Sequence, residues 1–183
     1  MLSLKKYDDL EKIVKKELKK NDNAPNYLID LGYLYAQISD ADKAKEQYEK
    51  AIKDLKPNEI AIRNMANAFE DYRLYGYEIK VYEKGAKALH NEAYFSFEMA
   101  QAYLNTGDVG NAVKYYLLNL EANPQNVQTI KNTIQTSRDE TKLLAEMETQ
   151  LFAKVQKKPD NDDFIDLLTW VYIQNKDFEG ALV

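Results

Sequence analysis

The chain contains no cysteine, one histidine and only six glycines among its 183 residues. The absence of cysteine excludes disulfides, thiolate catalysis and thiolate metal sites. Any Ser-His-Asp triad would have to use His90, and a zinc site built from several histidines is impossible. The few glycines form no phosphate-cradling loop. We therefore expect a protein that is not an enzyme and that needs no cofactor or metal.

Positive net charge and long apolar runs are also missing. The formal net charge is −5 and the isoelectric point is about 5.1, which argues against nucleic-acid binding because that requires a cationic surface. No apolar run approaches the ~18 residues that span a bilayer. We expect a soluble protein without direct membrane insertion, and the sequence leaves the compartment open between cytoplasm and periplasm.

What the sequence does contain is a repeat of 34 residues. Similar residues recur at this spacing in four columns. The columns are Leu31, Met65 and Met99; Gly32, Ala66 and Ala100; Tyr35, Phe69 and Tyr103; and Tyr48, Tyr82 and Tyr116. Helix-period apolar patterns alternate with short breaks, so each repeat is predicted to be two antiparallel helices. Because a lone helix pair cannot bury its apolar face, stacked pairs are expected to share one core.

These residues carry a resemblance to a known family. The pattern Leu31-Gly32-x-x-Tyr35, with Ala44, Tyr48 and Ala51 and a closing Pro57, resembles the tetratricopeptide repeat. The third unit is similar, with Met99-Ala100-x-x-Tyr103, Gly107-Asp108, Ala112, Tyr116 and Pro124. The second is weaker, since Glu78 and Gly85 stand where the family usually has alanine. The resemblance implies an all-α, right-handed superhelical solenoid of antiparallel helix pairs.

We predict a single domain of this kind over residues 1–183. The range 1–24 is expected to be a partial unit that supplies a second helix. Three repeats cover 25–58, 59–92 and 93–126, a degenerate repeat covers 127–160, and a truncated one covers 161–183. The degenerate repeat is expected to be helical from Leu143, Leu144, Met147, Leu151, Phe152 and Val155. Half-repeats at both ends lead us to expect a fragment of a longer protein, or ends that partner subunits cover.

The family resemblance implies a concave surface formed by the first helix of each unit. Its positions are three or four residues apart and so share one helix face. Large apolar and polar groups mix on that face, which is typical of a surface that binds a protein or peptide. The candidate binding residues are Ile29, Tyr33, Ile60, Arg63, Asn67, Tyr94, Phe97, Gln101 and Trp170. The alternative for the aromatic members is burial between neighbouring helices.

The expected function is therefore a protein interaction scaffold that binds a peptide or partner protein on an apolar-aromatic concave face. Family members that hold acidic chaperone tails use lysine, arginine and asparagine at set positions. Here Tyr94 and Glu98 stand in two of the basic positions, so a carboxylate clamp is not expected. The alternative function is an architectural module that spaces other domains of its parent or forms homo-oligomers through exposed end helices.

Two polar features have structural explanations. His90 is predicted to lie at the end of a helix, where it can interact with the helix dipole and terminal carbonyls. The acidic run that includes Asp160, Asp162 and Asp163 lacks the ligand spacing of an EF-hand calcium loop, because Phe164 and Ile165 interrupt it. We expect Asp162 or Asp163 to cap a helix instead.

Overall fold

The computed structural model describes residues 4–21, 24–177 and 180, and these residues form helices and turns without a β-strand. This confirms the predicted all-α fold of helix pairs. The α-helices are α1 (Leu4–Lys20), α2 (Pro25–Gln37), α3 (Ala41–Lys53), α4 (Glu59–Asp71), α5 (Tyr75–Ala88), α6 (Ser96–Thr106), α7 (Val109–Ala122), α8 (Val127–Thr136), α9 (Glu140–Lys157) and α10 (Asp162–Gln174). A short 3₁₀ helix, η1 (Pro124–Asn126), connects α7 to α8. None of these helices is long and apolar enough to cross a bilayer.

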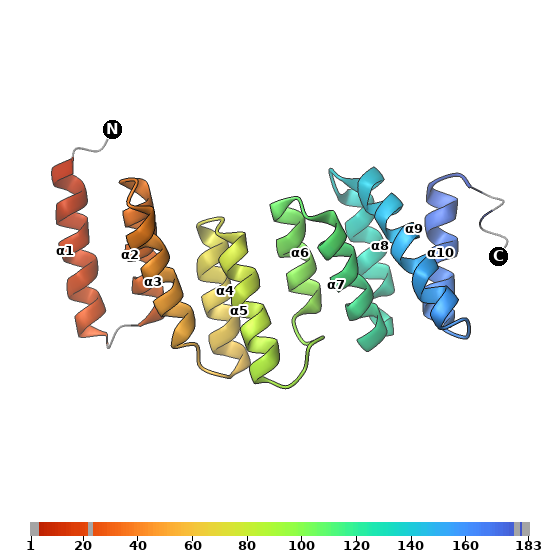
Figure 1. The fold of residues 1–183 in the computed structure, drawn as a ribbon, viewed down its shortest axis with the longest axis horizontal. Helices are drawn as coiled ribbons and strands as arrows, with labels where there is room; N and C mark the ends of the chain where they lie inside the picture. Colours follow the sequence, from red (N-terminus) through yellow and green to blue (C-terminus); the bar gives the residue numbers. More distant parts are fainter. Residues whose placement is uncertain (1–3, 22–23, 178–179, 181–183) are drawn as a thin grey trace. The chain divides into compact units, whose positions relative to one another are not determined.

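The chain divides into two compact units, residues 1–91 with α1 to α5 and residues 92–183 with α6 to α10. Within each unit, the two helices of each pair, such as α2 with α3 and α6 with α7, lie side by side (Figure 1). Each of the expected ranges 25–58, 59–92, 93–126 and 127–160 holds one pair of α-helices. In the range 161–183, α10 is described, whereas residues 178, 179 and 181–183 lie outside the described residues.

Side-chain caps begin the helices at the breaks in the apolar pattern. Asn58, Asp108 and Asn161 each accept a hydrogen bond from the backbone N–H three residues later, at 2.9–3.0 Å. The prediction that Asp162 or Asp163 caps α10 is wrong, because Asn161 does so. Both acids instead lie in the first turn, where their charge interacts favourably with the helix dipole.

A left-handed residue follows the first helix of four units, eight residues after Leu31, Met65, Met99 and Leu168 respectively. These residues are Ser39 (φ 64°), Arg73 (φ 56°), Gly107 (φ 81°) and Lys176 (φ 58°). The N–H of the residue that follows each donates to the carbonyl five residues before it, at 2.9–3.0 Å. This is the Schellman hydrogen bond, which turns the chain through a left-handed residue. A shared backbone turn therefore follows the first helix of these units, and in the units of α2, α4 and α6 it leads into the second helix. Only Gly107 has no Cβ to strain.

The repeated columns form the core. Leu31, Met65 and Met99 are at most 3% exposed, and the column that starts at Tyr48 is equally buried. The prediction that small residues allow close helix packing is clearest at Gly32. A Cβ there would lie only 2.4 Å from the nearest ring carbon of Tyr48.

In the unit formed by residues 92–183, α8 and α9 contribute to the same core as α6, α7 and α10. Ile130, Ile134, Leu143 and Met147 are all fully buried in that core. The degenerate range is thus helical and packed as expected. Phe152 is an exception to the predicted apolar stripe, because 47% of it is exposed on α9.

Candidate functional site

We number each repeat so that position seven is Leu31, Met65, Met99, Thr133 or Leu168. The candidate site is the face formed by positions two, five, nine, twelve and thirteen of α2, α4, α6, α8 and α10. We call it the first-helix face and describe it within each unit. Ile29, one of its expected members, is fully buried and contributes to the core instead. The reason is that α2 packs against α1, α3 and α4, so little of its circumference is left for solvent. Ile29 is thereby removed from the candidate binding residues.

Three large apolar side chains on the first-helix face are exposed. Ile60 on α4 is 72% exposed, Tyr94 just before α6 is 40% exposed, and Ile173 on α10 is 47% exposed. Ile60 and Tyr94 belong to the expected binding residues and hold the same repeat position. Because exposed side chains of this size cost free energy in water, they are candidates for contact with a partner.

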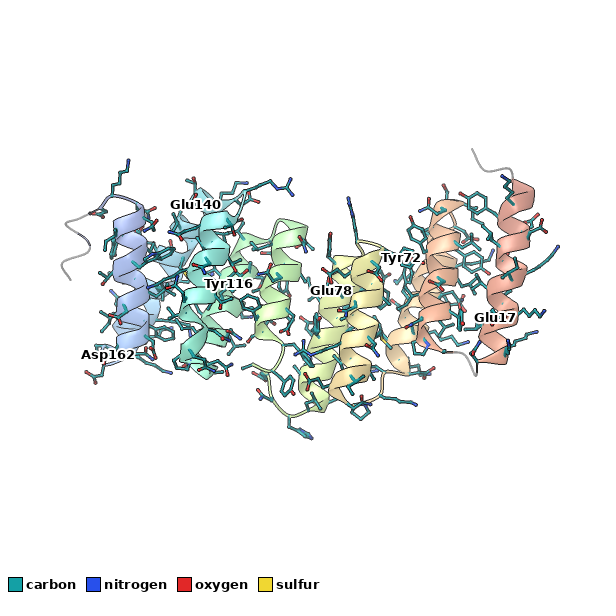
Figure 2. The ribbon with its side chains drawn as sticks, turned by 180° about the vertical axis from the view of Figure 1, so that it is seen from behind. Glu17, Tyr72, Glu78, Tyr116, Glu140 and Asp162 are labelled. Carbon is teal, nitrogen blue, oxygen red and sulfur yellow. The ribbon has the colours of Figure 1, made fainter. Side chains whose placement is uncertain are left out.

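Tyr33 packs within the unit formed by residues 1–91 rather than standing free. Its ring stacks on that of Tyr72 with centroids 4.1 Å apart. The hydroxyl of Tyr72, labelled in Figure 2, donates to Asp30 Oδ1 at 2.7 Å. Burial, and then this hydrogen bond, raise the pKa of the Tyr72 hydroxyl. Tyr33 is therefore only partly exposed, and its ring is held in a fixed orientation by Tyr72, which directly follows α4.

Polar residues accompany Ile60 on α4. Arg63 Nε donates to Glu59 Oε1 at 2.8 Å, one helical turn away. Asn67 is exposed one turn further along. The α4 part of the face therefore combines an apolar side chain with a guanidinium and an amide.

Phe97 and Gln101 both contact Tyr116 from α6. Phe97 meets the Tyr116 ring edge to face at 5.7 Å, and Gln101 Nε2 donates to the Tyr116 hydroxyl at 2.9 Å. Tyr116 is fully buried on α7, and burial raises the pKa of its hydroxyl (Figure 2). Phe97 and Gln101 are both half-buried, so each exposes only part of its side chain to a partner.

Trp170 lies on α10 beside Lys131 of α8. The ammonium of Lys131 is 5.6 Å from the centre of the indole ring, within range of a cation–π interaction. Gln135 Nε2 also donates to Gln174 Oε1 at 3.3 Å. The equivalent faces of α8 and α10 are thus in contact, and Trp170 is half-buried.

Each unit has a cleft next to these residues. In residues 1–91, a cleft of about 620 Å³ lies among the ends of α1 and α3 and the first turns of α2 and α4, and Asn26 and Asn64 line it. In residues 92–183, a cleft of about 310 Å³ is lined by Tyr94, Phe97, Glu98, Asn119, Asn123, Asn126 and Thr129.

The second cleft includes asparagines that lie outside the first helices, and sequence reasoning missed them. Asn126 Nδ2 donates to Asn119 Oδ1 at 2.9 Å, and Asn119 Nδ2 donates to Ser96 Oγ at 3.1 Å. The Ser96 hydroxyl in turn donates to the carbonyl of Ala93 at 2.6 Å. Helical spacing could not have indicated them, because α7 ends at Ala122 and Asn123 and Asn126 lie beyond it.

A buried carboxyl group lies away from both clefts. Glu78 on α5 is 5% exposed, and its Oε2 has no hydrogen-bond partner within the described residues (Figure 2). Burial, with a smaller contribution from the charge of Glu70, raises the pKa of Glu78 from 4.5 to about 7. Glu78 lines neither of these two clefts.

His90, the chain's one histidine, lies at the end of a helix. His90 follows the end of α5 with a φ of 53°, and its N–H donates to the carbonyl of Lys87 at 3.1 Å. Its place at a helix end is the one expected for a structural residue.

On α1, Leu10 and Ile13 are 42% and 58% exposed, which leaves an apolar stripe on an outer helix.

Comparisons with known proteins agree with this architecture. The sequence model described as tetratricopeptide repeat matches residues 25–53 and 93–126. No curated protein matches the sequence.

Several solved structures are similar. MamA has 15% identity and a TM-score of 0.42 over 93% of this chain and 90% of its own. YrrB, described as a TPR protein with an unusual peptide-binding site, has 16% identity and a TM-score of 0.41 over 92% and 87%. A tetratricopeptide repeat protein from Parabacteroides merdae has 14% identity and a TM-score of 0.43 over 95% and 69%.

Proposed function

Because this chain is a tetratricopeptide repeat protein, and such proteins are interaction scaffolds, we propose that it binds a peptide segment of a partner protein along its first-helix face. The exposed apolar side chains of that face are the observation that supports this proposal. Ile60, Tyr94 and Ile173 project large apolar surface where the helices carry polar neighbours. Full burial of one such side chain is worth roughly 1.5–3 kcal/mol, and a few anchors of this size account for most of the affinity of a typical interface.

The half-buried face residues have a second role in this proposal. Phe97 and Gln101 are held by Tyr116, and Trp170 is held beside Lys131. Side chains that are already ordered lose little rotamer entropy when a ligand binds, which favours affinity. Arg63, Asn67 and Gln101 supply polar groups that can orient a peptide backbone.

An acidic peptide tail does not suit this face. Tyr94 and Glu98 occupy two positions where a clamp for carboxylates requires basic side chains. Glu98 would repel a carboxylate there. We therefore propose that the ligand is not an acidic C-terminal tail.

The test compares exposed apolar residues on and off the face. Short random peptides are displayed and selected against the wild-type chain, and the affinity of selected peptides is measured by fluorescence anisotropy. We expect Ile60→Ser, Tyr94→Ala or Ile173→Ser to weaken peptides bound at the corresponding unit by about 10-fold or more, because an interface anchor is lost. Phe152→Ala is the matched control, since Phe152 is 47% exposed on α9 and outside the face.

The proposal would be wrong if all three variants bound the selected peptides with the affinity of the wild type while circular dichroism showed each variant to be folded. Weakening by Phe152→Ala alone would place the binding surface on the second helices instead.

The alternative function is an architectural module that associates with copies of itself. Leu10 and Ile13 on α1 favour it, because they form an exposed apolar pair on an outer helix. Sedimentation velocity of the wild type and of a Leu10→Ser, Ile13→Ser double variant tests this function. Concentration-dependent association that the double variant abolishes supports it, and a wild type that stays monomeric at high concentration removes it.

A further inference from the structure

The cleft in residues 92–183 combines three kinds of wall. Tyr94 and Phe97 supply aromatic surface, Glu98 supplies a carboxylate, and the remaining lining residues are amides and one hydroxyl. Its volume of about 310 Å³ is at the lower end of the range for pockets that enclose a ligand. It therefore suits a side chain and the backbone next to it better than a whole folded partner.

The asparagine side chains that line the cleft differ in how they are bonded. Asn119 is 5% exposed and is fixed between Asn126 and Ser96. Within the described residues, the side chains of Asn123 and Thr129 make no hydrogen bond. An asparagine amide presents a donor and an acceptor side by side, which matches the N–H and C=O of a peptide unit.

The aromatic wall is also held in place. Tyr94 meets the fully buried ring of Phe95 at 4.9 Å, and Phe97 meets Tyr116 at 5.7 Å. Tyr94 nevertheless keeps 40% of its surface exposed. A fixed, partly exposed aromatic face attracts cations through its quadrupole.

The negative charge in and around the cleft indicates the charge of the ligand. Glu98 is the one charged residue among the described side chains that line the cleft. Residues 92–183 contain 14 acidic and 8 basic residues, a formal net charge of −6, whereas residues 1–91 contain 16 acidic and 17 basic residues. Both the local carboxylate and the wider field of this unit therefore favour a cation.

From these features, we infer that the cleft binds a basic peptide segment and prefers arginine to lysine at the side chain that enters it. A guanidinium can stack on an aromatic ring while it donates to a carboxylate and to amide oxygens, whereas an ammonium offers a single compact charge. The inference rests on the proposed function, because it names the chemistry of a peptide bound beside Tyr94.

The experiment uses the full chain and displayed short random peptides. They are selected in parallel against the wild type, Glu98→Lys and Glu98→Gln. Glu92→Lys is the matched control, because it makes the same charge change in the same unit at an exposed residue that does not line the cleft. One enriched peptide is then made with its arginine replaced by lysine, alanine or glutamate, and affinities are measured by fluorescence anisotropy at low and high salt.

We expect the wild type and Glu92→Lys to enrich arginine next to an apolar residue. Glu98→Gln should weaken the arginine peptide by about 10-fold or more and reduce its salt dependence, because a charge-assisted hydrogen bond is lost. Glu98→Lys should lose the arginine preference. Within the peptide, affinity should fall in the order arginine, lysine, alanine, glutamate.

The outcomes separate the two proposals. Enriched peptides without basic residues, or an arginine preference that persists in Glu98→Lys and Glu98→Gln, would overturn this inference while leaving the peptide-binding scaffold intact. An equal loss in Glu92→Lys and Glu98→Lys would also overturn it, since net charge and not the cleft would then be responsible. Failure of every chain to enrich any peptide would remove the proposed function itself.

Discussion

Glu78 should make the stability of this protein fall as the solution changes from acidic to neutral. Its carboxyl is 5% exposed, and Oε2 lacks a hydrogen-bond partner within the described residues. Burial first, and the charge of Glu70 second, raise the pKa of Glu78 from 4.5 to about 7. The folded chain therefore keeps a proton between these pH values that the unfolded chain releases.

The sign and size follow from this difference. Stability from the protonated carboxyl is fully present below about pH 4.5 and is lost as the pH rises through about 7. A rise from 4.5 to about 7 corresponds to roughly 3 kcal/mol. Glu78→Gln carries no charge and escapes this loss, although its buried amide still costs about 1 kcal/mol where it lacks partners. We expect the variant to exceed the wild type in free energy of unfolding by about 1–3 kcal/mol at about pH 8.

Urea unfolding followed by far-UV circular dichroism measures this difference, at about pH 4.5 and about pH 8. At the lower pH we expect the advantage of Glu78→Gln to disappear. Glu70→Gln serves as a control, because it removes the smaller cause of the raised pKa and should give a smaller gain of the same sign at the higher pH. A stability difference between wild type and Glu78→Gln that is independent of pH would refute the reasoning.

Four further substitutions test the packing, the turns and the asparagine network, each by urea unfolding. Gly32→Ala should destabilise the chain by about 1–3 kcal/mol, because its Cβ would lie 2.4 Å from the Tyr48 ring. Gly76→Ala, which has nothing within 4 Å of its Cβ, should instead stabilise it by up to about 1 kcal/mol, and a loss in both variants would argue against overpacking. Arg73→Gly should gain about 1 kcal/mol by relieving the left-handed strain at φ 56°, and a loss would mean that its side chain contributes more than the strain costs. Asn119→Ala should cost about 1–3 kcal/mol because it removes both hydrogen bonds of a buried side chain, and an unchanged midpoint would show that the network adds no stability.

Much of the fold could be predicted because each repeat carries a strong periodic signal. The columns that begin at Leu31 and Tyr48 indicate buried positions, and the structure buries them. Capping residues such as Asn58 and Asp108 mark helix starts through local hydrogen bonds that lie within three residues of sequence.

The candidate site was less predictable because exposure depends on neighbours that are distant in sequence. Ile29 and Phe97 are two repeat lengths apart and so hold the same position on their first helices, yet Ile29 is fully buried and Phe97 is half-buried. The difference comes from how many helices surround α2, which a repeat register does not encode. The contacts among Asn119, Asn126 and Ser96 likewise join separate elements.

The left-handed turns offer a practical route to site-specific labelling. Ser39, Arg73 and Lys176 are exposed at turns whose hydrogen bonds come from the backbone, so their side chains contribute little to the fold. Since the chain has no natural cysteine, Ser39→Cys introduces a unique thiol by exchange of one atom. A fluorophore there can report peptide binding to residues 1–91, and the same chemistry at Lys176→Cys reports on residues 92–183. Together the two labels allow distance changes between the units to be followed in solution while a ligand is added.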